Sequence, residues 1–179
     1  MLSTVAIFAL QAAAPAVVAA PAPKPPTCDT ARHGEFDFWV GEWDVYPNLA
    51  DPAKAPLVAH SRIEKLYSGC AVRENWMPLK GTGGGSLNSV DPSTGRWHQL
   101  WIGSQPGRVE FDGGLADGKM VLTGWWSGIG GPGQDGMVRM TYTPIDPDTV
   151  RQHGELSTDH GLTWTTNFDF LYRRAKPAG

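Results

Sequence analysis

Polar and apolar residues alternate along most of the chain beyond Trp39, with the period of two that is typical of β-strands. Turn residues such as Asp117-Gly118 and the Pro- and Asp-rich stretch 144–148 break this alternation about every ten positions. One short helix is expected at residues 31–38. The pattern then predicts ten strands, at residues 42–46, 57–66, 70–77, 85–90, 97–102, 108–112, 119–125, 137–143, 150–157 and 163–173.

Consecutive short strands joined by tight turns favour an all-β fold. We expect an up-and-down antiparallel barrel of about ten strands with a short N-terminal helix, because closure removes the exposed edges of so large a sheet. The alternation also predicts which side chains point inward. In the last strand Trp164, Phe168, Phe170 and Tyr172 share the face that we expect to line the interior, and Thr165 lies on the opposite face.

Three of the predicted inward faces also carry a polar residue, namely Glu74, Gln99 and Gln152. A polar group inside a closed core costs about 1–3 kcal/mol unless it has a hydrogen-bond partner. Two interpretations follow. These residues either bond to one another in a structural network, or they surround a cavity that holds water or a ligand.

Our leading hypothesis is a barrel that binds a small, partly apolar molecule in its interior. Such pockets usually exceed about 300 Å³, and an internal volume well below this value would argue against a binding barrel and against a barrel enzyme. Residues 126–136 and 80–84 are expected to form part of the cavity rim. The expected ligand-binding residues combine apolar walls with orienting polar groups: Trp76, Trp97, Trp101, Phe168, Glu74, Asn88, Gln99 and Gln152.

Two alternatives remain open. The first is a barrel enzyme of the isomerase, cyclase or lyase type that uses Glu74 as acid or base, with Arg139 or Arg151 as its counter-charge. The second is a structural or interaction protein of the cell envelope, whose core is filled by the eight Trp residues and holds no ligand. We expect a binding protein rather than an enzyme and assign no catalytic residue.

The first twenty residues contain no charged side chain and are apolar and Ala-rich, which is typical of a signal peptide. A transmembrane anchor is disfavoured because Gln11 and Pro15 interrupt the apolar run. We therefore divide the chain into a signal peptide (1–20), a Pro-rich spacer (21–27), a barrel domain (28–174) and a tail (175–179). The expected location is periplasmic or secreted, with no membrane span in the mature chain.

The chain has two cysteines, Cys28 and Cys70. In the oxidising compartment that a signal peptide implies, two cysteines are expected to form a disulfide with each other. The alternative is a pair of buried free thiols.

Charge and motif content exclude several partners. The formal net charge is −3 and no block of Lys or Arg occurs, so no nucleic acid or anionic membrane partner is expected. The five His show no metal-ligand spacing, and His98 and His153 are predicted to point outward from their strands rather than toward a haem. We expect no metal and no cofactor, and the oligomeric state stays open.

One turn motif has a structural explanation. The stretch from Ser157 to Trp164 resembles the Asp-box, a motif that occurs repeatedly in sialidase-like propellers. In those proteins the Ser and Asp side chains bond to the turn backbone and the Trp packs below. A single copy predicts a brace for the last hairpin rather than a propeller.

The stretch from Phe36 to Val45, FDFWVGEWDV, carries a further resemblance. Its Gly41-x-Trp43 resembles the signature of the lipocalin and fatty-acid-binding (calycin) superfamily, in which the Trp closes the bottom of the barrel. Together with motifs at 68–70, 74–76, 86–88, 97–101, 150–152 and 157–164, it is similar to a family of uncharacterised exported bacterial proteins with a lipocalin-like domain. The resemblance spans roughly residues 28–174. It implies the calycin fold and supports the Cys28–Cys70 bridge, but it implies no activity.

Overall fold

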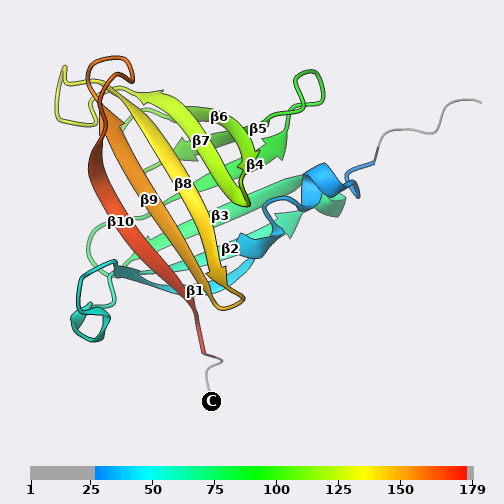
Figure 1. Cartoon of the computed structure of the whole chain (residues 1–179), viewed down its shortest axis with the longest axis horizontal. Coiled ribbons are helices and arrows are strands. Elements are labelled where there is room, and N and C mark those ends of the chain that lie inside the picture. Colours follow the sequence, from blue (N-terminus) through cyan, green and yellow to red (C-terminus); the bar gives the residue numbers. More distant parts are fainter. Residues whose placement is uncertain (1–26, 177–179) are drawn as a thin grey trace, which may run out of the picture.

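The computed structural model describes residues 27–176 as a closed barrel of antiparallel strands (Figure 1). The predicted signal peptide, the spacer up to residue 26 and residues 177–179 lie outside the described residues. Each strand pairs with its neighbours in the chain, and β1 pairs with β10 to close the sheet. The strands are β1 (Gly41–Pro47), β2 (Ala59–Leu66), β3 (Ala71–Pro78), β4 (Gly84–Val90), β5 (Trp97–Ile102), β6 (Val109–Ala116), β7 (Lys119–Trp126), β8 (Gly136–Asp146), β9 (Thr149–Ser157) and β10 (Thr165–Arg174).

The predicted up-and-down barrel is therefore confirmed, and each predicted strand overlaps an observed one. The expected helix at 31–38 consists of two 3₁₀ turns, η1 (Ala31–Gly34) and η2 (Asp37–Trp39). Two more such turns are η3 (Pro52–Lys54) and η4 (Tyr67–Gly69). So short a segment does not sustain an α-helix on its own. Between residues 27 and 176, no helix is long and apolar enough to cross a membrane.

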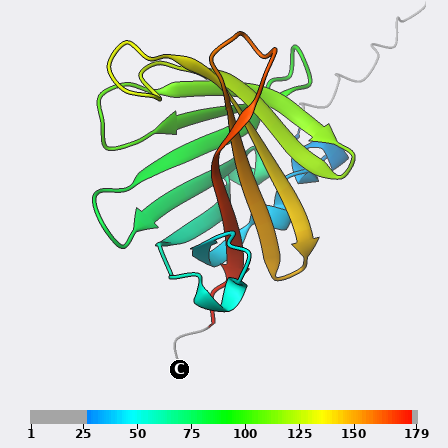
Figure 2. The ribbon, with the colours of Figure 1, turned by 60° about the vertical axis from the view of Figure 1, so that its left-hand side comes forward.

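The loops of an up-and-down barrel alternate between its two ends. The loops after β1, β3, β5, β7 and β9 lie at one end, which we call the open end. Figure 2 shows the loops after β7 (yellow) and β9 (orange) at this end, while β10 (red) leaves the barrel at the other. The N-terminal turns η1 and η2 pack near the opposite end (Figure 1), which we call the closed end.

Aromatic side chains fill the closed end. Phe36, which lies between η1 and η2, and Trp39, the last residue of η2, are fully buried and stack with ring centroids 4.9 Å apart. Phe36 also meets Trp97 and Tyr142 edge-on, at 5.7 and 5.1 Å. Such edge-to-face contacts stabilise an aromatic core beyond the area that they bury. This cluster seals one mouth of the barrel.

Trp43 in β1 joins this seal through its indole nitrogen. Its Nε1 donates a hydrogen bond of 2.8 Å to the backbone oxygen of Trp39, and the Arg174 guanidinium lies 4.4 Å from its ring centroid. Gly41 has a φ of 146°, and a side chain there would clash with Arg174. Trp43 thus packs at the closed end, as the calycin resemblance implies.

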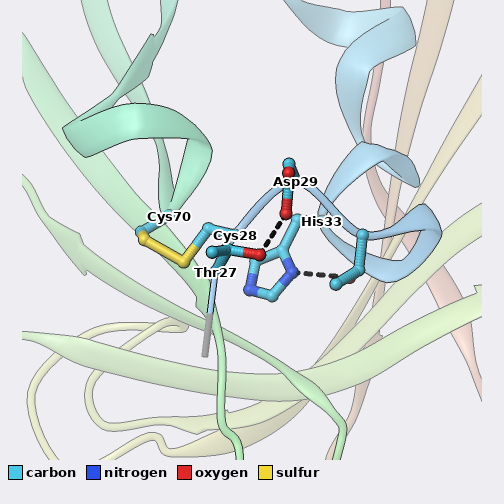
Figure 3. Close-up of a disulfide and its surroundings, with 6 residues drawn as sticks. Thr27, Cys28, Asp29, His33 and Cys70 are labelled. Atoms are coloured by element: carbon cyan, nitrogen blue, oxygen red, sulfur yellow. Dashed lines mark hydrogen bonds between the residues drawn. A yellow bond between two sulfur atoms is a disulfide. The ribbon is translucent and has the colours of Figure 1, made fainter. Parts of the chain in front are cut away.

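Cys28 and Cys70 form the predicted disulfide, with their Cα atoms 4.9 Å apart (Figure 3). The bridge ties the segment before η1 to the residue that precedes β3. An ion pair of 2.6 Å between Lys65 in β2 and Asp37 in η2 fastens the same segment a second time. The N-terminal seal is therefore anchored to the barrel wall.

The alternation predicted for the last strand holds for Phe168, Phe170 and Tyr172 but is wrong for Trp164. A β-bulge between Thr166 and Phe168 shifts the register, so that Thr165 rather than Trp164 is in phase with the inward face. Trp164 instead packs under the guanidinium of Arg139, 4.2 Å from the ring centroid.

The β9–β10 turn has the brace that the Asp-box predicts. Asp159 accepts hydrogen bonds from the Thr163 backbone (2.9 Å) and from the hydroxyls of Thr163 and Ser157. The Trp164 indole donates to the Gly161 carbonyl at 3.0 Å. The hydrogen bonds from Thr163, together with that from Ser157, lower the pKa of Asp159 to about 2.

Replacing both Cys28 and Cys70 with Ser should lower the free energy of unfolding by about 4 kcal/mol. The reason is that the bridge restricts the unfolded chain across a sequence separation of 42 residues. Urea denaturation followed by tryptophan fluorescence measures the change. Wild-type protein under reducing conditions is the matched control and should lose a similar amount. If the free energy of unfolding falls by less than about 1 kcal/mol in both the double variant and the reduced wild-type protein, the bridge has no anchoring role.

Candidate ligand-binding site

The barrel encloses a cavity of about 190 Å³ between its centre and its open end. Six of the eight predicted ligand-binding residues line this cavity: Glu74, Trp76, Gln99, Trp101, Gln152 and Phe168. The lining is completed by residues outside the predicted set, namely Phe111, Trp126, Met140, Tyr142, Phe170 and Tyr172.

Asn88 and Trp97 point into the barrel but do not line this cavity. Both are nearly fully buried and lie closer to the closed end. Trp97 packs in the aromatic seal and donates from its indole to a Glu35 carboxylate oxygen at 3.1 Å. Alternation predicts the face on which a side chain lies, but it does not predict the depth in the barrel that the side chain reaches.

The same alternation places five of the missed lining residues inward, so a signal for them exists in the sequence. They are Phe111, Met140, Tyr142, Phe170 and Tyr172. Trp126 gives no such signal, because it precedes a Gly-rich segment and the predicted strand ends at residue 125. In the structure β7 extends to Trp126, and its ring meets Phe111 edge-on.

Polar side chains form a hydrogen-bonded layer at the cavity floor. The Tyr172 hydroxyl lies 3.2 Å from Glu74 Oε1 and 2.8 Å from Gln152 Oε1. Gln152 in turn donates from its Nε2 to the Tyr142 hydroxyl at 3.1 Å. These bonds join β3, β10, β9 and β8 across the interior.

The layer continues along the other side of the barrel and closes on itself. Gln99 donates from its Nε2 to the Tyr142 hydroxyl (3.3 Å) and to Asn88 Oδ1 (2.6 Å). Asn88 donates to the Ser86 hydroxyl at 3.1 Å, and Ser86 donates to Glu74 Oε2 at 3.4 Å. We call this closed set the polar ring: Glu74, Tyr172, Gln152, Tyr142, Gln99, Asn88 and Ser86. Its members bond to one another, and most of them also face the cavity.

Among the described residues, Glu74 is the one buried residue with an ionisable acidic or basic side chain of the Asp, Glu, Lys, Arg or His type. Only 4 % of its surface is exposed. Burial raises its pKa to about 7, although hydrogen bonds from Ser61, Tyr172 and Ser86 oppose the shift. The predicted counter-charges are wrong. Arg139 pairs with Glu155 at 2.9 Å and Arg151 pairs with Asp169 at 2.7 Å, in contacts on the outer face of the barrel.

The two tyrosines of the polar ring stay protonated at neutral pH. Burial, with the nearby Glu74 carboxylate, raises the pKa of both Tyr142 and Tyr172 well above the ordinary value. Their hydroxyl groups therefore act as hydrogen-bond donors and acceptors and not as bases.

A second cavity, of about 560 Å³, adjoins the first at the open end. It is lined by residues 103–108 of the β5–β6 loop and by most of residues 127–132 of the β7–β8 loop. Trp101 and Trp126 line both cavities. The predicted rim segment that begins at 126 therefore lines this outer cavity. Residues 80–84, in the β3–β4 loop and the first position of β4 at the same end, line neither cavity, but the Thr82 carbonyl accepts a hydrogen bond of 2.9 Å from the Ser104 hydroxyl.

The strand histidines face away from the cavity. His98 lies 3.0 Å from Asp112 and His153 lies 3.0 Å from Thr166, both on the outer surface as predicted. His60 also lies in a strand, β2, and contacts Asp44 at 2.8 Å. The part of the chain that the structure covers holds no group of three His, Cys, Asp or Glu side chains arranged to hold a metal ion.

Comparison with known proteins identifies the fold alone. No protein family matches the chain, and no curated protein matches it in sequence. Among solved structures, the S-type phycobiliprotein lyase of Guillardia theta superposes with a TM-score of 0.50 at 15 % identity, over 84 % of this chain and 96 % of the other. The two proteins share the β-barrel fold.

Replacing Glu74 with Gln should change how stability depends on pH. Because the pKa of Glu74 is about 7 in the folded state and near 4.5 when exposed, the folded protein binds more protons between these values. The wild-type free energy of unfolding therefore carries a term that falls by about 3 kcal/mol from pH 4.5 to 7. The free energy of unfolding of Glu74→Gln minus that of the wild type should therefore rise by about 3 kcal/mol between pH 4.5 and 7, and it should stay constant above pH 7.

Urea titrations at half-unit pH intervals measure this difference. Glu155→Gln is the matched control on the outer face, since the hydrogen bond from Arg139 lowers the pKa of Glu155. The stability term of Glu155 therefore changes only below about pH 4.5, and this variant should show no slope from pH 5 to 7. Equal slopes in both variants would contradict the assignment of a raised pKa to Glu74.

Proposed function

We propose that the protein is an exported lipocalin-like barrel that binds a small, partly apolar molecule in its interior. The observation that carries this proposal is the cavity itself, whose walls are largely aromatic and whose floor is the polar ring. Concave apolar sites with a few convergent polar groups are typical of small-molecule sites. We propose that the ligand contacts the six predicted residues that line the cavity. Asn88 and Trp97, which lie closer to the closed end, support these residues and do not contact the ligand.

The size of the cavity limits the ligand. At about 190 Å³ the inner cavity alone falls short of the roughly 300 Å³ that we expected for a binding barrel, and the site reaches that size only together with the adjoining outer cavity of about 560 Å³. An apolar cavity of about 150 Å³ is enough to enclose benzene. The enclosed part of the ligand is therefore about the size of one substituted ring. A longer molecule would extend past Trp101 and Trp126 into the outer cavity.

Export is part of the proposal. The Cys28–Cys70 disulfide is compatible with an oxidising compartment, and the apolar, uncharged residues 1–20 have the composition of a signal peptide. Both features support a periplasmic or secreted protein and agree with the resemblance to exported lipocalin-like proteins.

An enzyme that uses Glu74 is the second candidate function. A buried carboxyl group with a pKa of about 7 suits acid or base catalysis at neutral pH. The hydroxyl of Tyr172 lies 3.2 Å away and offers a second polar group to a substrate in the cavity. The structural neighbour is named as a lyase, which is compatible with either candidate.

The envelope-protein alternative receives less support, because it requires the eight Trp residues to fill the core. Only Trp39, Trp43 and Trp97 are fully packed inside. Trp76, Trp101 and Trp126 line the cavity, and the remaining two pack elsewhere: Trp125 is exposed and Trp164 packs under Arg139.

Native mass spectrometry of the protein purified from its own host should reveal a bound small molecule that denaturation releases. Met140→Trp, which places an indole in the inner cavity, should abolish this mass increment. Leu115→Trp is the matched control, because Leu115 is exposed in β6 and lies outside the cavity. Thermal denaturation establishes that both variants are folded. A mass increment that survives Met140→Trp in folded protein, or its absence from wild-type protein, would count against the proposal.

A further inference from the structure

The carboxylate of Glu74 has weak partners on every side. Its donors are Ser61 at 3.2 Å, Tyr172 at 3.2 Å and Ser86 at 3.4 Å. Hydrogen bonds between a hydroxyl and an oxygen acceptor ordinarily measure about 2.5–3.0 Å, and those to a carboxylate fall at the short end. Each of these contacts is longer. The single Tyr172 proton is moreover shared with Gln152, which lies closer at 2.8 Å.

Glu74 also lacks a counter-charge. The ion pairs found between residues 27 and 176 do not include it. The residues that line the inner cavity include no Lys, Arg or His, and the titratable groups that face Glu74 are the neutral hydroxyls of Tyr172 and Tyr142. A buried charge without a partner costs several kcal/mol. The site is therefore electrostatically incomplete when Glu74 is ionised.

The walls above Glu74 favour positive charge as well. Trp76 and Trp101 occupy the next inward positions toward the open end on β3 and β5, and Phe168 and Phe170 stack at 5.5 Å on β10. The faces of aromatic rings carry negative electrostatic potential and attract cations, Trp most strongly. An anionic ligand would be repelled both by this potential and by the ionised carboxylate.

We propose that the molecule bound in the inner cavity is a small organic amine in its ammonium form, with the nitrogen held by the Glu74 carboxylate and the apolar part surrounded by the aromatic walls. This inference rests on the proposed binding function and specifies its ligand class. The ammonium group supplies the missing counter-charge and donates to Glu74 Oε2, whose one protein donor is distant. The apolar remainder corresponds to about one ring, given the cavity volume.

Binding of an amine is then coupled to the proton on Glu74. The carboxyl group has to be ionised to pair with the ammonium, so binding below its pKa of about 7 releases one proton. Affinity should be constant from this pH up to the pKa of the amine, which is about 10 for an alkylamine, and should fall by about tenfold per pH unit below pH 7. Tyr142 and Tyr172 stay neutral throughout this range and do not alter the dependence.

The test compares two probes of nearly equal shape, 2-phenylethylamine and 2-phenylethanol, by isothermal titration calorimetry at pH 8 and pH 5.5. Wild-type protein should bind the amine at least about tenfold more tightly than the alcohol at pH 8, since only the amine pairs with the carboxylate. That preference should shrink by more than about tenfold at pH 5.5. Titrations near pH 6 in two buffers of different ionisation enthalpy should report the release of about one proton.

Two variants separate a specific role of Glu74 from general damage. Glu74→Gln keeps the shape of the side chain and should remove the preference for the amine at pH 8 while it retains binding of the alcohol. Glu155→Gln, on the outer face, should retain the full preference.

The outcomes distinguish this inference from the proposed function. If the alcohol binds as tightly as the amine, or if the preference survives Glu74→Gln, the ligand class is wrong and the binding function stands. If neither probe binds at millimolar concentration, the amine inference is wrong, and native mass spectrometry decides the binding function separately. A preference that does not change between pH 8 and pH 5.5 in wild-type protein also overturns the inference, even where Glu74→Gln does not fold.

Discussion

The antiparallel pairing of β1 with β10 joins the first strand to the last and turns the sheet into a closed barrel. Closure gives every strand two hydrogen-bonded neighbours and leaves no exposed edge. It also creates an interior that inward side chains have to fill. Barrels of about eight strands are just wide enough to be filled by their own side chains. With ten strands the interior is wider, and other parts of the chain decide how much of it is occupied.

Three layers divide this interior along the barrel axis. The closed end is filled by an aromatic cluster that includes Phe36 and Trp39, which belong to no strand. The disulfide and the Lys65–Asp37 ion pair hold these residues in place from outside. The polar ring crosses the middle of the barrel. Beyond it lies the cavity, whose lining includes none of the described N-terminal residues 27–40.

The position of a carboxylate in this fold determines its chemistry. On the outer face, hydrogen bonds from arginine lower the pKa of Glu155, and the Arg151 hydrogen bonds lower that of Asp169 despite its partial burial. Inside, burial raises the pKa of Glu74 to about 7. One carboxyl group in an aromatic cavity therefore has a pKa close to neutral pH. This property underlies the proposed binding function and the catalytic alternative.

The sequence by itself determined the barrel of about ten strands and the inward faces of most strands. These features depend on local alternation and turn chemistry, which each segment carries independently of the others. The sequence also identified Glu74, Gln99 and Gln152 as polar residues on inward faces, but it left a network and a cavity as alternatives. In the structure these residues take part in both.

Only the tertiary structure decided how deep in the barrel each inward side chain lies, where the strand register shifts and which charged residues pair. Trp97 and Trp101 share one face of β5, yet the first belongs to the aromatic seal and the second to the cavity, because the N-terminal turns fill only one end. A bulge before Phe168 moved Trp164 off the inward face. Arg139 and Arg151 found partners on neighbouring strands rather than Glu74. Each of these outcomes depends on contacts between segments far apart in the chain, which a pattern of period two does not contain.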